Sequence, residues 1–255
     1  MKNKIFFWIM IFFFLIITLT ACSGNDNSPS TVVTAISAGD KHTVALKNDS
    51  TVLTWGLNSY GQLGDGTSKD SHTPVPVVVW GLNFHGQSGD GTWTYGHTTV
   101  PVSGLTGITA ISAGGYRTVA LRNDGTVWAW GRNVEGELGD GTTTDRNTPV
   151  QISGLTGITA ISARVFNTVA LKNDGTVWAW GLNSSGQLGD GTMTDSSIPV
   201  QVIGLTGITV ISAGDLHTVA LKHDSTVWDW GLNFSGQLGD GTTTNSSTPV
   251  QVKGW

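Results

Sequence analysis

A unit of about 50 residues recurs along this chain and constrains its fold more than any other feature of the sequence. Residues 110–159, 160–209 and 210–255 align with one another, and residues 35–77 form a further copy. A fixed period in this range predicts a repeat architecture, in which each unit buries its apolar side against its neighbours. The 35 glycines and the low content of charged residues, 12%, favour strands and turns over helices.

Each unit contains four short apolar runs that are rich in β-branched or aromatic residues and bounded by turn formers, so each run predicts a strand. In the best-preserved part of the chain these runs are Ile108–Ala113, Thr118–Arg122, Thr126–Trp130 and Pro149–Ile152. Asp124 and Gly125 between the second and third runs predict a tight hairpin, because this pair readily adopts positive φ angles. Four successive strands per unit predict an all-β fold, a β-propeller of four-stranded blades.

The array is irregular near its start. Trp55 and Trp80 are 25 residues apart, whereas Trp80 and Trp130 are 50 apart. We therefore expect a truncated second unit at residues 78–109, about 4.5 repeats in all, and an incomplete or open ring. At the seam, two strands that should run in opposite directions are joined without a turn signal. Either the chain bends at Pro76–Val79 or the first unit docks abnormally, and a sequencing error or a decayed gene are alternatives.

The N-terminus has the pattern of a bacterial lipoprotein signal. Two lysines precede an almost wholly apolar stretch, Ile5–Leu19, and small residues follow it. Leu19–Cys22 (LTAC) resembles the lipobox, where cleavage leaves a cysteine that carries the lipid, and Cys22 is the sole cysteine of the chain. We predict a signal peptide over residues 1–21, a flexible tether over 22–34 and the repeats over 35–255. The alternative is an uncleaved anchor, although about 15 apolar residues are few for a membrane span.

Three stretches carry a resemblance to a known family. Gly39–Leu46 (GDKHTVAL), Gly214–Leu221 (GDLHTVAL) and Asn183–Thr192 (NSSGQLGDGT) resemble the regulator of chromosome condensation repeat, and the match extends over about 220 residues. The resemblance implies a propeller, usually of seven four-stranded blades. Family members that catalyse nucleotide exchange on a small GTPase use a protruding segment. The third to fifth units have identical spacing and show no such segment, so exchange activity is only an alternative by analogy.

The Gly-Asp-Gly-Thr loops recur in every unit, and a calcium or phosphate loop is the chemical interpretation of them. Each loop offers one carboxylate, whereas calcium takes about six to eight oxygen ligands, and no lysine follows the glycines as in a phosphate-binding loop. We therefore predict turns, with no metal and no cofactor. The aspartates concerned are Asp65, Asp90, Asp140, Asp190 and Asp240.

Two other recurring positions also favour structural roles. His42 and His217 occupy a position that holds Arg117 and Asn167 in other units, which predicts hydrogen bonding to a neighbouring loop rather than catalysis. Paired tryptophans stand two residues apart and therefore share one face of a strand, where they can fill the space between sheets. Stacking against sugars is the alternative for these pairs, which are Trp128/Trp130, Trp178/Trp180 and Trp228/Trp230.

The residues that vary between units gather in the turn after the first strand and in the loop after the third. In an up-and-down meander these two segments emerge on the same face, and aromatic residues on loops are common anchors of binding surfaces. The alternative is drift of unconstrained loops, and Tyr60 faces the other way if the seam reverses the first unit. The candidate partner-binding residues are Tyr60, Phe84, Trp93, Tyr95, Tyr116, Phe166 and Phe234.

These features predict a non-catalytic recognition scaffold in the bacterial cell envelope. It would be held outside the cytoplasm, at the outer membrane or the outer leaflet of the cytoplasmic membrane, only by the lipid on Cys22. We expect a protein partner, with a glycan second. Nucleic acid is excluded by the net charge of −5 and the lack of basic runs. The alternatives are a secreted-type inhibitor of an enzyme and a truncated gene remnant. A propeller lyase or hydrolase is disfavoured because no acid and base groups converge.

Overall fold

A computed structural model describes residues 33–38, 42–47, 52–56, 69–77, 83–94, 102 and 105–254, and for most of residues 33–56 and 74–77 it describes the backbone alone. All regular structure in these ranges is β-strand. Within the same ranges, no helix is long and apolar enough to cross a bilayer.

The strands form four sheets of four strands each, and within each sheet neighbouring strands are antiparallel and follow one another in sequence. The first sheet contains β1 (Val33–Ala38), β2 (His42–Lys47), β3 (Val52–Gly56) and β4 (Ser71–Val77). The second contains β5 (Ile108–Gly114), β6 (Arg117–Arg122), β7 (Val127–Gly131) and β8 (Arg146–Gln151). The third contains β9 (Ile158–Ala163), β10 (Asn167–Lys172), β11 (Val177–Gly181) and β12 (Ser196–Gln201). The fourth contains β13 (Ile208–Ala213), β14 (His217–Lys222), β15 (Val227–Gly231) and β16 (Ser246–Gln251).

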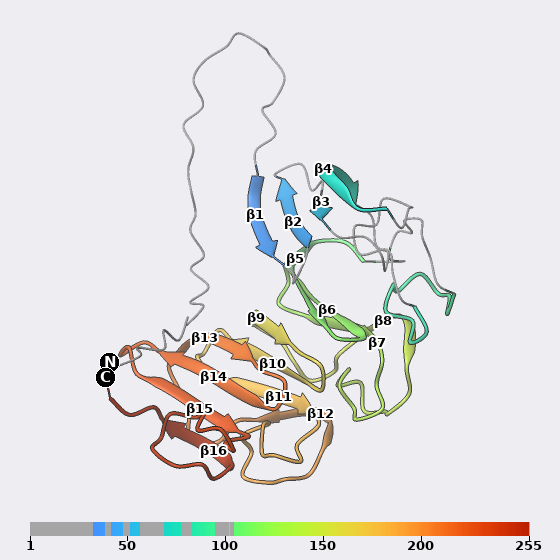
Figure 1. Cartoon of the computed structure of the whole chain (residues 1–255). Coiled ribbons are helices and arrows are strands. Elements are labelled where there is room, and N and C mark those ends of the chain that lie inside the picture. Colours follow the sequence, from blue (N-terminus) through green and yellow to red (C-terminus); the bar gives the residue numbers. More distant parts are fainter. Residues whose placement is uncertain are drawn as a thin grey trace, which may run out of the picture.

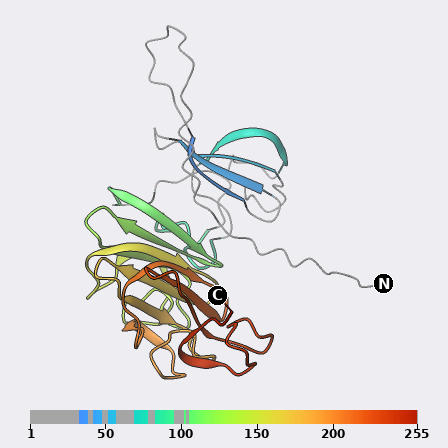
Figure 2. The ribbon, with the colours of Figure 1, turned by 90° about the vertical axis from the view of Figure 1, so that its left-hand side faces the viewer.

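The sheets follow one another around an open arc, with β5, β9 and β13 on its inside (Figure 1). Seen from the side, the second, third and fourth sheets are stacked and the first stands at the end of the stack (Figure 2). The prediction of an all-β array of four-stranded units with an open ring is confirmed.

The predicted strands agree with the observed ones except at the fourth strand of each unit. β8 begins at Arg146, three residues before the expected start at Pro149. The polar residues 146–148 were assigned to a loop because they lack apolar character. They lie on the outer edge strand of the sheet, where half-exposed positions and a proline are tolerated.

The first unit completes its sheet before the seam. β4 ends at Val77, and Gly56 pairs with Ser71 as Gly131 pairs with Arg146 in the second sheet. The polarity of the first unit is therefore the same as that of the others up to Val77. Of the expected bend at Pro76–Val79, Pro76 and Val77 lie in β4, and the rest lies outside the described residues.

The core lies between the sheets rather than within one of them. Val119, Leu121 and Ala129 of the second sheet pack with Trp180 of the third, and the same positions of the third sheet pack with Trp230 of the fourth. Trp130, Trp180 and Trp230 are buried, while Trp178 and Trp228 are half-buried against these clusters. The predicted packing role of the tryptophans is confirmed, and each buried ring contributes about 2–3 kcal/mol by area.

Candidate functional site

The variable segments of each unit emerge on one face of the array. The Arg132 N–H donates to the Tyr116 carbonyl at 3.0 Å, and Leu182 and Phe166 are joined in the same way at 2.9 Å. These bonds tie the loop after the third strand to the turn after the first. We call the surface made by these segments the loop face; it comprises residues 83–94, 114–117, 132–145, 164–167, 182–195, 214–217 and 232–245. The prediction that they share one face is confirmed.

The loop after each third strand is organised by a buried asparagine. The Asn183 side-chain amide donates to the carbonyls of Thr192 and Thr194 at 3.2 and 3.1 Å, and its oxygen accepts the Leu188 N–H at 2.9 Å. Gly186 and Gly189 within the loop have φ angles of 82° and 69°, which other residues rarely adopt. Asn83, Asn133 and Asn233 are buried in the same way. Each loop is therefore held in one conformation from inside.

The aspartates of these loops close turns, as predicted. The Asp190 carboxylate accepts the Thr192 N–H at 3.0 Å and the Thr192 hydroxyl at 2.9 Å. Asp90, Asp140 and Asp240 bond the threonine two residues later in the same way, and Asp65 lies outside the described residues. In the described part of the chain, no group of three or more His, Cys, Asp or Glu side chains is placed to hold a metal ion.

The same loops also hold the following sheet, which the sequence reasoning missed. The Trp230 indole N–H and the Thr218 hydroxyl both donate to the Gln187 carbonyl, each at 3.0 Å. Further along the loop, the Gly191 N–H donates to the Ser247 carbonyl at 2.9 Å. We call these segments the clasp loops: 83–92, 133–142, 183–192 and 233–242. Their near-identity across units was the signal for this role, because a simple turn tolerates more variation.

Clasp loop 83–92 belongs to the truncated second unit and acts on the second sheet. The Gln87 carbonyl accepts the Trp130 indole N–H at 2.8 Å and the Thr118 hydroxyl at 3.2 Å. The Gly91 N–H donates to the Asn147 carbonyl at 2.8 Å. The truncated unit therefore retains the part that contacts its successor.

At the position that varies between histidine, arginine and asparagine, the arginine and the asparagine hydrogen-bond the next unit, as predicted. The Arg117 guanidinium donates to the Val165 carbonyl at 2.8 Å and to the Asn167 carbonyl at 2.6 Å. The Asn167 side chain in turn donates to the Thr218 hydroxyl at 3.4 Å. Burial lowers the pKa of His217, against the opposing effect of Asp215. The side chain of His42 lies outside the described residues.

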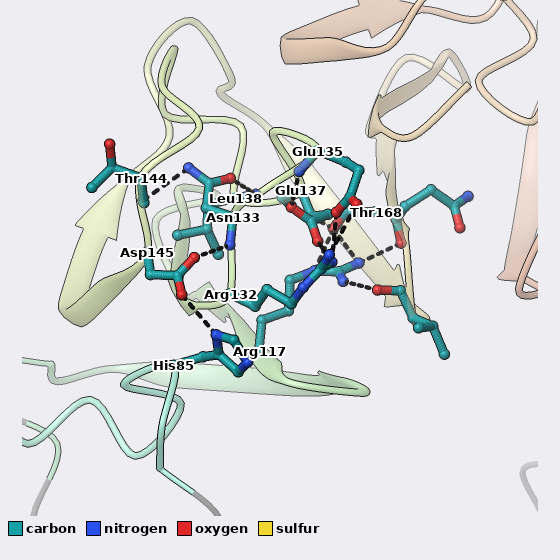
Figure 3. Close-up of polar contacts among 12 residues, drawn as sticks. His85, Arg117, Arg132, Asn133, Glu135, Glu137, Leu138, Thr144, Asp145 and Thr168 are labelled. Atoms are coloured by element: carbon teal, nitrogen blue, oxygen red, sulfur yellow. Dashed lines mark hydrogen bonds and ion pairs between the residues drawn. The ribbon is translucent and has the colours of Figure 1, made fainter. Parts of the chain in front are cut away.

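The second sheet carries a charged cluster that the other units lack (Figure 3). Glu137 is buried where Gln187 and Gln237 stand elsewhere, and the Arg132 guanidinium contacts Glu137 and donates to Glu135 at 2.9 Å. Burial raises the pKa of Glu137 despite the nearby arginines. Burial also lowers the pKa of Arg117 to about 10, which the charge of Glu137 opposes.

Beside this cluster, the ring of His85 points toward Asp145 (Figure 3), with 2.7 Å between Nδ1 and the carboxylate. The same ring lies against Tyr116, with 5.4 Å between the ring centroids. A ring contact between two units thus supports Tyr116 on the loop face. His85 was not singled out by the sequence analysis.

The candidate aromatic residues differ in exposure. Phe84 and Phe234 occupy equivalent positions of two clasp loops and are 67% and 75% exposed. Trp93 and Tyr116 are nearly half exposed, and Phe166 is half-buried. His85, which follows Phe84 in the chain, contacts Tyr116, and Phe234 lies in a different unit. Tyr60, Tyr95 and Cys22 lie outside the described residues.

Comparison with known proteins identifies the repeat. A family model described as the regulator of chromosome condensation (RCC1) repeat matches residues 49–79, 124–171, 174–221 and 224–254. A second model with the same description matches residues 33–62, 108–137 and 158–187.

Solved structures share the fold. Human WBSCR16 matches with 22% identity and a TM-score of 0.59 over 91% of this chain and 55% of the other. Prp20p from Saccharomyces cerevisiae matches with 18% identity and a TM-score of 0.60 over 89% of this chain and 52% of the other. Yeast RCC1 (Prp20) bound to Kap60 matches with 18% identity and a TM-score of 0.61 over 90% of this chain and 50% of the other. The chain therefore spans about half the length of these proteins.

Proposed function

Because the chain belongs to the regulator of chromosome condensation (RCC1) repeat family, we propose that it is a non-catalytic recognition scaffold that binds a protein through its loop face. Protein partners accompany two of the similar structures: Prp20p was described with its binding to Gsp1p and histones, and yeast RCC1 with Kap60. The lipobox-like sequence ending at Cys22 supports a lipid tether that holds this scaffold at the bacterial cell envelope.

The observation that carries the proposal is the pairing of rigid loops with exposed aromatic rings. Asn83 fixes clasp loop 83–92 by donating to the Thr92 and Thr94 carbonyls at 3.1 and 3.2 Å, while Phe84 projects from the same loop. A preorganised loop loses little conformational entropy on binding, so an aromatic anchor on it contributes most of its burial to affinity. Phe84 and Tyr116 form the main anchor, and Phe234 a second one.

The proposal is tested with the full chain as bait for proximity labelling on living cells. We expect a labelled partner that then binds the purified chain directly, and we expect Phe84→Ala with Tyr116→Ala to weaken that binding at least tenfold. The matched control is Ile198→Ala, which removes an exposed apolar side chain from the outer strand β12.

Equal binding by the double variant and the control would contradict the loop-face assignment, provided that both variants melt like the parent chain. A glycan array forms the second arm of the experiment. Binding to a glycan that depends on Phe84 and Tyr116, without a protein partner, would replace the protein partner with a sugar ligand.

A further inference from the structure

The outward face of the fourth sheet, β13–β16, is built like an interior face. Leu121 and Leu171 occupy the same position in the second and third sheets, where the next sheet buries them to 4% and 5% exposure. Leu221 at this position is 37% exposed, and Val210 beside it is 52% exposed. The fourth sheet therefore presents the apolar surface that the earlier sheets use for stacking.

The junction between the second and third sheets and the junction between the third and fourth sheets also repeat a set of polar contacts. On the inside of the arc, a serine hydroxyl accepts an N–H of the next sheet: Ala163 to Ser112 and Ala213 to Ser162, both at 2.9 Å. Farther out, a carbonyl of the clasp loop accepts a threonine hydroxyl of the next sheet at 3.0 Å, as between Glu137 and Thr168. At the outer strand, a clasp glycine N–H donates to a carbonyl of the next sheet, as from Gly141 to Ser197 at 2.9 Å.

The fourth unit has the groups with which each earlier unit holds its successor, but among the described residues they have no such partner. Ser212, the Gln237 carbonyl and the Gly241 N–H stand at the three positions, and none of them has a hydrogen-bond partner of this kind among the described residues. A Cβ atom on Gly139 or on Gly189 would meet a tryptophan of the next sheet. On Gly239 it would instead meet Val252 of the same unit.

The first sheet has, at the same register positions, the residues that receive these contacts in the later sheets. Ala38, Thr43 and Trp55 occupy the register positions of Ala213, Thr218 and Trp230, since Ala38 pairs with Thr43 and Thr43 with Trp55 in the same order. His72 follows Ser71 in β4 as Ser247 follows Ser246 in β16, so its carbonyl is the matching acceptor at the outer strand. One chain thus has complementary faces at the two ends of its arc.

We propose that the first sheet of a second copy of this chain packs onto the outward face of β13–β16. Each copy gives one face and receives one, so the contact is head-to-tail, and in the assembly that we propose two open arcs close one ring with two-fold symmetry. Counting the four described sheets of each copy, the dimer contains eight four-stranded sheets. This assembly goes beyond the loop-face function and does not depend on it, because the clasp contacts and Leu221 face along the arc.

The first test is native mass spectrometry of the full chain released from detergent micelles. We expect a dimer for the parent chain and a monomer for Leu221→Glu, with the dissociation constant raised at least tenfold. The control Ile198→Glu places the same charge at an exposed isoleucine of β12 and should remain dimeric. A monomeric parent chain, or equal dimer content in Leu221→Glu and Ile198→Glu, overturns the proposal.

A second test remains decisive if Leu221→Glu does not fold. In a Cys22→Ser background, chains carrying Ser212→Cys and Ala38→Cys are mixed and oxidised, and we expect a disulfide-linked heterodimer. The control mixture of Ser212→Cys with Ile198→Cys should remain unlinked. If the mixture does not crosslink, while a single chain carrying both Ser212→Cys and Ala38→Cys forms an internal disulfide as a monomer, the faces meet within one copy and the proposal is wrong.

Discussion

Asp229 is a carboxylic acid buried in the core. It stands in the middle of β15 where Ala129 and Ala179 stand in the preceding sheets, and only 3% of it is exposed. One carboxylate oxygen has no hydrogen-bond partner. Burial raises the pKa of Asp229 from 3.8 to about 8, although the Trp230 N–H opposes the shift. The folded protein therefore holds this carboxyl protonated at neutral pH.

We predict that Asp229→Ala stabilises the fold, by about 2 kcal/mol at pH 7.5. The folded pKa lies above the unfolded one, so the folded state binds the proton more tightly. The contribution of the Asp229 carboxyl to the free energy of unfolding is therefore greatest below pH 4. It falls as the pH rises toward 8, by at most about 1.4 kcal/mol per pH unit. Urea unfolding of both proteins at pH 5 and pH 8 measures the difference.

Asp229→Asn serves as the control, since it removes the titration but keeps a buried polar group. We expect it to flatten the pH dependence without the full gain of Asp229→Ala. If the three proteins lose stability equally between pH 5 and pH 8, the slope has another source and the assignment to Asp229 is wrong.

At the residue scale, comparison between units predicted the roles of residues that recur and missed the roles of residues that differ from the repeat. The turn role of Asp190 and the bonding role of Arg117 followed from their recurring positions. Asp229 and Glu137 are single substitutions in otherwise constant strands and loops, and their burial depends on the fold of neighbouring segments. A search for residues that break the repeat, such as Asp229 against Ala129 and Ala179, would have identified them.

Among the elements, the clasp loop depends on the absence of side chains where it crosses a tryptophan. A Cβ atom on Gly139 would lie 2.7 Å from Nε1 of Trp180, and its φ angle is 75°. Gly154 has a φ angle of 80° and nothing within 4 Å of the same added atom. The two glycines therefore share backbone strain and differ in packing.

We predict that Gly154→Ala costs about 1 kcal/mol of unfolding free energy, the cost of the left-handed backbone. Gly139→Ala adds displacement of the Trp180 ring and should cost about 3 kcal/mol. Thermal or urea unfolding of both variants gives the comparison. Equal destabilisation would mean that the loop does not press on Trp180.

In the charged cluster, Arg132 forms an ion pair with Glu137 of clasp loop 133–142. The equivalent residues of the next unit are Leu182 and Gln187. We predict that Arg132→Leu and Glu137→Gln each cost about 2 kcal/mol, because the first leaves the buried Glu137 carboxylate without this guanidinium and the second leaves Arg132 with Glu135 alone of its two carboxylates. The double variant should lie closer to the parent chain, with a coupling of at least about 1 kcal/mol. A double-mutant cycle in urea measures it, and simple additivity would contradict the pairing.

At the element scale, alternation of apolar residues and hairpin signals predicted the first three strands of each unit within a few residues. The fourth began earlier than predicted, because the pairing of Gly131 with Arg146 depends on the partner strand rather than on local apolar character. The contact between each clasp loop and the next sheet could not be derived from local pattern, since it joins residues about 30 to 60 positions apart.

For the molecule as a whole, the inner strand of the second sheet, which follows the truncated unit, has a more exposed isoleucine than the inner strands of the third and fourth sheets. Ile111 of β5 is 67% exposed, whereas Ile211 at the same position of β13 is buried and Ile161 of β9 is half-buried. Clasp loop 83–92 contacts β6, β7 and β8 of the second sheet, while Ile111 of β5 remains exposed.

We predict that the amides of β5 exchange with solvent at least tenfold faster than those of β9, because local opening of β5 exposes less apolar surface that was buried. Hydrogen exchange followed by mass spectrometry on peptides that cover residues 108–114 and 158–163 tests this. Equal protection of the two strands would mean that the first sheet covers β5 in solution.

The architecture of the whole was predictable because the repeat period and four strands per unit leave few alternatives to a propeller array. The open ring followed from the 25-residue step between Trp55 and Trp80. Which faces of the array remain uncovered could not be derived from the sequence. It depends on how clasp loop 83–92 of the truncated unit reaches the second sheet.

Each clasp loop precedes in the chain the sheet that it holds. A nascent chain leaves the ribosome from its N-terminus, so every new blade finds its docking loop already made. Assembly can therefore proceed in one direction during translation. A unit added after the last one by gene duplication would likewise meet a clasp loop that already exists. The same polarity explains how a shortened unit can fit into the array, because it retains the segment that holds its successor.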